Sequence, residues 1–330
     1  MSRVAVRLVA ALGILSAHVY ADPDAAPDAS GDGFVSLYNG KDLSGWEVKE
    51  GQRKVWQANG ELLSCARGGW LRTSKMYSDF VLKMEYRIRP DGNGGVGLRI
   101  PAKGNPAHAG MKIAIVDDDS LVNKDLPPQR STGAIYDQAP ARAGASKAAG
   151  EWNAYEITCL GPQVKVVLNG EVINDILTDG FTKGEGGHLP LSDRPGIGFI
   201  GLQGRDSPID FRSLAVKDLT ARTRSGVNYV DLSVGKGSVV SHRSTVVVHY
   251  VGRLADGAKF DSTYDHDPPR PSSLALEDVI PGWQEGIPGM RAGGRRKLII
   301  PPGLAYGNRA RDKIPANSLL IFDVEVLEVR

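Results

Sequence analysis

The sequence is poor in cysteine and in charge of one sign, and each shortage excludes a class of function. Its 330 residues include two cysteines, and they form no CxxC, HExxH or Cys/His cluster that would indicate a zinc site. The sequence therefore predicts no metal centre and no cofactor. Its 40 Lys and Arg residues are scattered among 38 Asp and Glu residues, and the net charge is only +2. Nucleic acid is not an expected partner.

Long apolar runs are also missing, since none in the sequence is long enough to cross a bilayer. Residues 1–21 combine Arg3 and Arg7 with a short apolar run and a small residue at Ala21. This is the pattern of a cleaved export signal, and a frayed amphipathic helix is the alternative. Residues 22–32 consist largely of Asp, Ala and Pro, which predicts a disordered leader. We expect an exported protein, periplasmic or extracellular, with no membrane span.

The two cysteines, Cys65 and Cys159, leave two alternatives open. Both lie in strand-like stretches, far apart in the sequence. An exported protein could join them in a disulfide. They could equally be two buried thiols in strands that never approach each other.

The length of the chain allows two domains, each with its own core. From residue 33 to 220 the sequence consists of short alternating or apolar runs separated by turn residues, with scarcely any helical period. Phe80, Leu82, Met84 and Tyr86, for example, alternate with polar or smaller residues, and Asn169-Gly170 is the signal of a tight hairpin. The pattern predicts a β-sandwich.

Several motifs of this first domain carry a family resemblance: FVSLYNGKDLSGW (34–46), GGVGLRI (94–100), GAIYD (133–137), GEWNAYEI (150–157) and IGFIGLQGR (197–205). The region resembles the 3-keto-disaccharide hydrolase family, whose members are similar to concanavalin-like jelly rolls. The resemblance implies a sugar cleft, and carbohydrate as a partner. Family members commonly have an acidic residue and a Gln where this chain has Lys112 and Ala114, which argues against glycoside cleavage. The candidate residues of the cleft are Arg99, Asp117, Asp118, Tyr136 and Glu151.

Residues 221–226 are short, polar and end in Gly, which predicts a linker. In the region after it, residues 227–330, TVVVHYVGRL alternates so that Val246, Val248 and Tyr250 share one face of a strand. Asp256-Gly257 supplies the turn of a hairpin that returns Phe260 and Asp261 beside Tyr250. Pro281 then begins a helix with Trp283 on its inner face.

These motifs, with GLAYGNRA (303–310) and LIFDVEVL (320–327), closely resemble the FKBP-type peptidyl-prolyl cis-trans isomerases. The resemblance implies an α+β domain in which an antiparallel sheet wraps a short helix. It also implies that Asp261 and Tyr306 act on the substrate amide, with the Ile280 N–H as a further donor. The implied proline-binding pocket is lined by Tyr250, Phe260, Val279, Ile280, Trp283 and Phe322.

Two positions depart from the family pattern. Family members usually have Phe-x-Phe where this chain has Arg270 to Ser273, so one aromatic wall is expected to be missing. Members also often place Arg where His266 stands. If a charged His266 orders Asp261, activity should weaken as pH rises through the titration of His266.

The sequence as a whole predicts a mainly β protein, with a jelly-roll sandwich followed by an FKBP-like domain. The expected function is isomerisation of Xaa-Pro bonds in exported client proteins, with the sandwich serving binding or localisation. One alternative is a chaperone or scaffold that binds proline-containing segments without turnover. Another is a glycoside hydrolase that acts on 3-keto sugars through the first domain.

Overall fold

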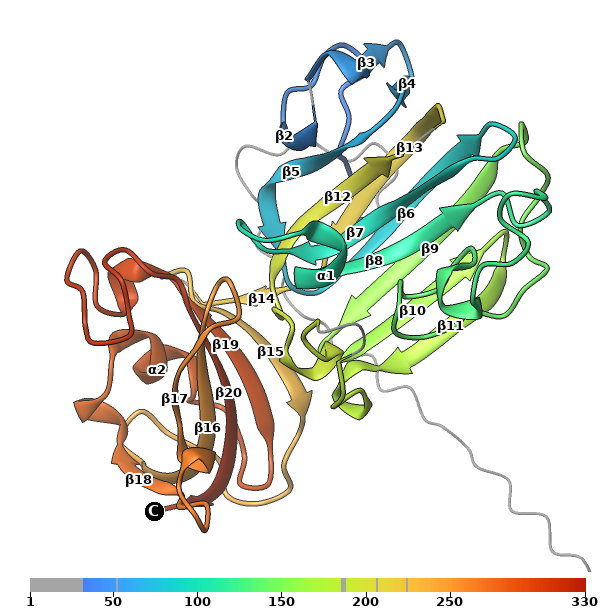
Figure 1. Ribbon diagram of the computed structural model, residues 1–330. Coiled ribbons are helices and arrows are strands. Elements are labelled where there is room, and N and C mark those ends of the chain that lie inside the picture. Colours follow the sequence, from blue (N-terminus) through green and yellow to red (C-terminus); the bar gives the residue numbers. More distant parts are fainter. Residues whose placement is uncertain (1–31, 52, 185–187, 206, 224) are drawn as a thin grey trace, which may run out of the picture.

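The computed structural model describes residues 32–51, 53–184, 188–205, 207–223 and 225–330. Two β domains follow one another along the chain (Figure 1). The predicted export signal and nearly all of the predicted leader lie outside the described residues. Within them, no helix is long and apolar enough to cross a membrane.

Two antiparallel sheets face each other in the first domain (Figure 1). The eight-stranded sheet has the spatial order β11 (Glu171–Leu177), β10 (Gln163–Leu168), β9 (Asn153–Leu160), β6 (Phe80–Ile88), β13 (Ile209–Asp218), β4 (Leu62–Cys65) and β3 (Trp56–Asn59), with β1 (Val35–Ser36) paired to β13. The five-stranded sheet has the order β2 (Trp46–Gly51), β5 (Gly69–Tyr77), β12 (Gly198–Gly204), β7 (Asn93–Ile100) and β8 (Met111–Val116). The predicted sandwich is confirmed.

The core of the sandwich lies between these sheets, because every second residue of a strand points inward. Phe80, Leu82, Met84 and Tyr86 of β6 are buried as predicted, and they pack against Leu71, Val96, Leu98 and Ile113 of the opposite sheet in one cluster. Asn169 and Gly170 have positive φ and connect β10 to β11, so the predicted hairpin is also confirmed.

Cys65 and Cys159 are two buried, free thiols. They lie on β4 and β9, which are separated by β13 and β6. Three strand spacings place them about 14 Å apart or more, whereas a disulfide needs Cα atoms within roughly 7 Å. Burial raises the pKa of each thiol to about 11.

Short helices connect the strands of both domains. The α-helices are α1 (Pro106–Ala109) and α2 (Pro281–Gly286). The 3-10 helices are η1 (Arg53–Val55), η2 (Pro128–Arg130), η3 (Thr178–Gly180), η4 (Leu191–Asp193), η5 (Thr263–Asp265), η6 (Leu276–Asp278) and η7 (Pro302–Leu304).

The second domain is a seven-stranded antiparallel sheet packed on α2 (Figure 1). Its spatial order is β14 (Ala221–Arg222), β15 (Asn228–Ser233), β19 (Arg295–Ile300), β20 (Leu320–Val329), β16 (Thr245–Leu254) and β17 (Lys259–Ser262), with β18 (Ser272–Ala275) also paired to β16. The predicted linker contains β14, which pairs with the first residues of β15. The predicted helix is short, since it ends at Gly286, and Ile287 and Met290 are buried in the segment that follows it.

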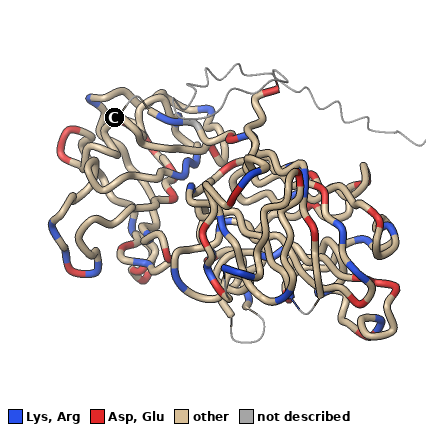
Figure 2. Tube along the Cα trace, turned by 90° about the horizontal axis from the view of Figure 1, so that it is seen from above, with Lys and Arg blue, Asp and Glu red and all other residues tan. Residues whose placement is uncertain are grey.

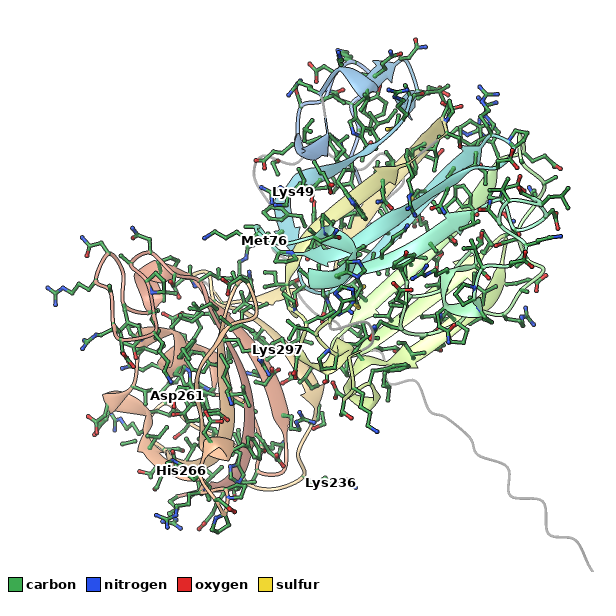
Figure 3. The ribbon with its side chains drawn as sticks, viewed as in Figure 1. Lys49, Met76, Lys236, Asp261, His266 and Lys297 are labelled. Carbon is green, nitrogen blue, oxygen red and sulfur yellow. The ribbon has the colours of Figure 1, made fainter. Side chains whose placement is uncertain are left out.

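The two domains meet through apolar and charged contacts. Ile197 of the sandwich packs with Ile299 and Ile321 of the second domain, and all three are almost fully buried. Arg253 forms an ion pair of 3.5 Å with Asp193 across the junction, and Figure 3 places Lys297 there as well. Along the described backbone, basic and acidic residues are interspersed (Figure 2).

Candidate functional sites

A cup of aromatic rings lies between the sheet of the second domain and α2. Tyr250, Trp283 and Phe322 contact one another edge to face, with ring centroids 5.2–6.1 Å apart. Phe260 adds a fourth ring, 5.5 Å from Phe322 and nearly perpendicular to it. Edge-to-face contacts are the preferred geometry of aromatic pairs. The strand register explains why these rings lie together. Gly252 of β16 pairs with β17 on one side and β20 on the other, and its lack of a side chain leaves room for Phe260 and Phe322, which a Cβ there would meet.

One carboxylate lies at the edge of this cup. The Tyr250 hydroxyl donates a hydrogen bond of 2.6 Å to Oδ2 of Asp261. Burial, and then this bond and the charge of Asp261, raise the pKa of Tyr250. Tyr250 is therefore a neutral donor at physiological pH, and it holds the Asp261 carboxylate in one position beside the rings.

The remaining predicted pocket residues lie around the cup. Val279, Ile280 and Tyr306 are half-buried against the aromatic cluster. The Ile280 carbonyl accepts the first hydrogen bonds of α2, from the N–H groups of Trp283 and Gln284. Within the described residues the Ile280 N–H has no hydrogen-bond partner, so it can donate to a ligand in the cup.

Both predicted departures can be located. Ser272 pairs with Val248, and so it lies on the face of the sheet that carries Tyr250. The gap expected in the aromatic wall therefore lies at Ser272. His266 is exposed, lies apart from Asp261 (Figure 3), and makes no hydrogen bond or ion pair in the part of the chain that the structure describes. Asp261 is instead held by the Tyr250 hydroxyl, so the structure lends no support to the role expected of His266, and its pH dependence stays a prediction.

In the sandwich the predicted candidates do not form one site. Arg99 is 3 % exposed and lies at the end of β7. Its guanidinium donates to the carbonyl groups of Ser78 and Gly161 and pairs with Asp79 at 3.2 Å. Because all of these partners are internal, Arg99 is a structural residue and not a sugar ligand.

The acidic candidates also serve local structure. The Asp117 carboxylate accepts the N–H of Asp91, and that of Asp118 accepts the N–H of Thr132. Both follow the end of β8, where such turns are favoured. The Glu151 side chain is exposed and has no partner among the described residues. No group of three or more potential metal ligands lies within the described residues.

Tyr136 belongs to a cluster that the sequence did not predict, which we call the outer-face cluster. It lies on the face of the five-stranded sheet that points away from the core. Lys112 of β8 is 2 % exposed, with its Nζ 4.6 Å from the Tyr136 ring centroid. His108 of α1 lies 6.0 Å from Tyr136 and stacks on His188 at 3.6 Å. The cluster consists of Lys112, Tyr136, His108, His188, Gln203 and Trp70.

Polar atoms in this cluster lack partners. Gln203 Oε1 and His108 Nδ1 are buried, and neither has a hydrogen bond in the part of the chain described. Buried polar atoms are normally paired, so unpaired ones that converge on one face indicate a place for a polar ligand. The sequence carried only a weak signal for this cluster, because Lys112 and Gln203 lie far apart in the chain and share a face only through sheet register.

A cavity of about 300 Å³ lies at the junction of the two domains and not at either cluster. Arg99, Arg194, Arg253, Arg295, Lys297, Asp179 and Asp323 contribute to its lining. Most of these charges already have internal partners, as in the pairs Arg253–Asp193 and Lys297–Asp323.

The aromatic cup on a sheet-wrapped helix defines the second domain as an FKBP-type domain. A family model for FKBP-type peptidyl-prolyl cis-trans isomerases matches residues 237–327. The chain is 43 % identical over 122 residues to the FKBP-type peptidyl-prolyl cis-trans isomerase FkpA of Escherichia coli K12, and 44 % identical over 111 residues to FkpA of Buchnera aphidicola. These alignments cover 37 % and 33 % of this chain. The chain spans less than half the length of these relatives, at 44 % and 43 %.

The two facing sheets define the first domain as a jelly-roll sandwich. A crystal structure of a candidate glycosyl hydrolase from Parabacteroides distasonis is similar to it, with a TM-score of 0.52 and 27 % identity, over 56 % of this chain and 99 % of that one. The model of the 3-keto-alpha-glucoside-1,2-lyase-like domain matches residues 33–217. Since this match covers more than half of the chain, the protein belongs to that family and carries an FKBP-type domain after it.

Proposed function

We propose that this protein is an exported peptidyl-prolyl cis-trans isomerase that acts on Xaa-Pro bonds of other proteins. The observation that carries the proposal is the aromatic cup with Asp261 held at its edge by Tyr250. An apolar cup suits a proline ring, and the groups around it suit the amide that precedes the ring.

The cup can lower the rotation barrier without forming a covalent bond. Rotation about an amide costs about 18–20 kcal/mol because twisting removes the resonance between nitrogen and carbonyl. A twisted amide has a more carbonyl-like oxygen and a pyramidal nitrogen, so a site that binds it better than the planar form accelerates rotation. In this proposal, the apolar rings desolvate the amide, the Ile280 N–H and the Tyr306 hydroxyl donate to carbonyl oxygens, and Asp261 favours the twisted state electrostatically.

The test is the cis-to-trans rate of a short Leu-Pro peptide with the wild-type protein and with Tyr306→Phe and Asp261→Ala. We expect acceleration by the wild type that falls in both folded variants. Each variant removes a polar group and leaves the ring cluster of Trp283 and Phe322 in place. A folded wild type that leaves the rate uncatalysed would overturn the proposal. Retained peptide binding with uncatalysed kinetics would instead indicate a chaperone or scaffold.

A second function is supported by the outer-face cluster of the sandwich. We propose that this face binds a ketone-bearing sugar, because the family is named for 3-keto-glucosides and the cluster has unpaired polar atoms beside aromatic rings. Aromatic faces with a few polar groups are a common form of ligand site. Lys112 stands where family members commonly have an acidic residue, which disfavours hydrolysis. We therefore propose that the sugar is bound without glycoside cleavage. Titration of the protein with methyl 3-keto-α-glucopyranoside tests it, with saturation-transfer NMR as the measurement.

We also propose that the protein acts outside the cytoplasm. The pattern of residues 1–21 supports export, and proline-containing clients would then be proteins outside the cytoplasm. Fractionation of cells that express the whole chain would test it. Recovery of the protein with cytoplasmic markers and with residues 1–21 still attached would contradict it.

A further inference from the structure

Lys112 of the sandwich is a buried charged residue without an ion pair among the described residues. It is 2 % exposed, although lysine is almost never fully buried without a charged partner. No carboxylate lies within ion-pair distance of it among the described residues, and its Nζ makes no hydrogen bond there. The nearby Asp137 carboxylate already pairs with Arg130 at 2.6 Å. The contact that remains to the ammonium group is the face of Tyr136.

The backbone holds the lysine arm in one place. A Cβ at Gly95 would lie 2.5 Å from Lys112 Cε, so the absence of a side chain at Gly95 makes room for the arm. Gln203 pairs directly with Gly95 across the strands, and the two residues share a face. Lys112 and Gln203 therefore both lie beside Gly95 on the outer face of the sheet. The Tyr136 N–H donates to the Lys112 carbonyl at 2.9 Å, which holds the backbones of the two residues side by side.

We propose that Lys112 is a nucleophilic amine that captures the ketone of a bound sugar as an imine. The inference rests on the proposed sugar binding at the outer-face cluster and deepens it. The Lys112 nitrogen lone pair forms a bond to the carbonyl carbon, and the carbonyl oxygen takes up a proton to give a carbinolamine. Loss of that oxygen as water leaves the C=N bond, so the step consumes one ketone and one amine and releases one water.

The surroundings of Lys112 favour the neutral amine that this step needs. Burial, and then the positive charge of Arg205, lower the pKa of Lys112 to about 7; Arg130 adds a smaller effect and Asp137 opposes them. At neutral pH a substantial fraction of Lys112 is therefore unprotonated, whereas an exposed lysine is almost entirely protonated. A desolvated lysine of lowered pKa is the usual form of a lysine that reacts with carbonyl compounds.

Reductive trapping tests the proposal on the full chain. The protein is incubated with methyl 3-keto-α-glucopyranoside and sodium cyanoborohydride, and peptide mass spectrometry locates the secondary amine that forms. Methyl α-glucopyranoside, which has the same ring without the ketone, is the ligand control. We expect adduct at Lys112 at least tenfold above that at any other lysine, and none with the control sugar.

Two variants separate the reaction from a structural role. Lys112→Met keeps an unbranched arm over Gly95, and Lys112→Arg keeps the charge; both should lose the adduct. Lys83→Met, on the exposed face of the other sheet, should keep it. Equal labelling of many lysines, unchanged in Lys112→Met, would overturn the proposal. Sugar binding by NMR without an adduct would overturn imine formation alone, whereas no binding of the keto sugar would overturn the sugar site as well.

Discussion

The Tyr250 hydroxyl and the Asp261 carboxylate, 2.6 Å apart, form the hydrogen bond that joins the aromatic cup to its charged edge. β16 and β17 bring the two residues together, and Asp261 pairs with Gly252 in that hairpin. Since Asp261 is otherwise exposed, this bond is what restricts its side chain.

Tyr250→Phe should therefore weaken isomerisation while leaving the cup intact. Loss of a hydrogen bond to a charged group costs about 1.5–3 kcal/mol, which corresponds to a fall in kcat/KM of roughly ten- to 150-fold. The measurement is the isomerisation rate of a Leu-Pro peptide. Tyr264→Phe, at an exposed ring stacked on His249, is the matched control and should keep wild-type activity. Equal activity in Tyr250→Phe would show that the bond has no role in the reaction.

Ser272→Phe should add an aromatic wall to the cup. Ser272 lies on the Tyr250 face of the sheet, whereas its neighbour Ser273 points the other way. A new ring at position 272 can bury part of a proline side chain, and about 1 kcal/mol of apolar burial would tighten peptide binding roughly fivefold. The measurement is peptide affinity by calorimetry. Ser273→Phe is the control, and tighter binding by this variant would contradict the assigned face.

Arg99→Met should destabilise the sandwich, because it leaves the Asp79 carboxylate buried with one internal donor fewer. Burial raises the pKa of Asp79 against the opposing effect of Arg99, so removal of the guanidinium leaves the charge poorly compensated. Breaking a buried pair costs about 3–5 kcal/mol, and the melting temperature should fall by roughly 6–20 °C. Arg142→Met removes an exposed pair with Glu171 and should change it little. Similar melting temperatures for the two variants would refute the structural role of Arg99.

The free energy of unfolding of the sandwich should increase as pH rises above neutrality, because of the lowered pKa of Lys112. Its pKa is about 7 in the folded protein and 10.5 ordinarily, so between these values the unfolded chain binds a proton that the folded chain does not. Stability then rises by up to about 1.4 kcal/mol per pH unit. Urea unfolding between pH 7 and 9 measures the slope. Lys112→Met should lose this part of the slope and Lys83→Met should keep it. An unchanged slope in Lys112→Met would refute the lowered pKa.

The sequence was most informative where function depends on neighbours along the chain. The hairpin at Asp256-Gly257 is set by local turn chemistry, with Gly257 at positive φ, and it predicted that Phe260 and Asp261 return beside Tyr250. Alternation along β6 likewise predicted its buried face. These patterns are local, since successive residues of a strand point to opposite faces.

The sequence was least informative about the sandwich site. Arg99 was a candidate sugar ligand, although its partners Ser78 and Gly161 come from distant loops. Of the outer-face cluster, only Tyr136 was predicted as a site residue, because the other members come from α1, β5, β8, β12 and the loop around His188. No spacing rule connects such residues.

By itself, the sequence determined that this protein has two β domains, and it located the aromatic and acidic residues of the second one. Periodicity and turn residues carry that information because hydrogen bonding and burial act on adjacent residues. Only the tertiary structure decided that Tyr250 orders Asp261, that Cys65 and Cys159 stay apart, and that Lys112 is buried without an ion pair to any described carboxylate. Strand order and register place these groups, and both are set by packing between segments that are far apart in the chain.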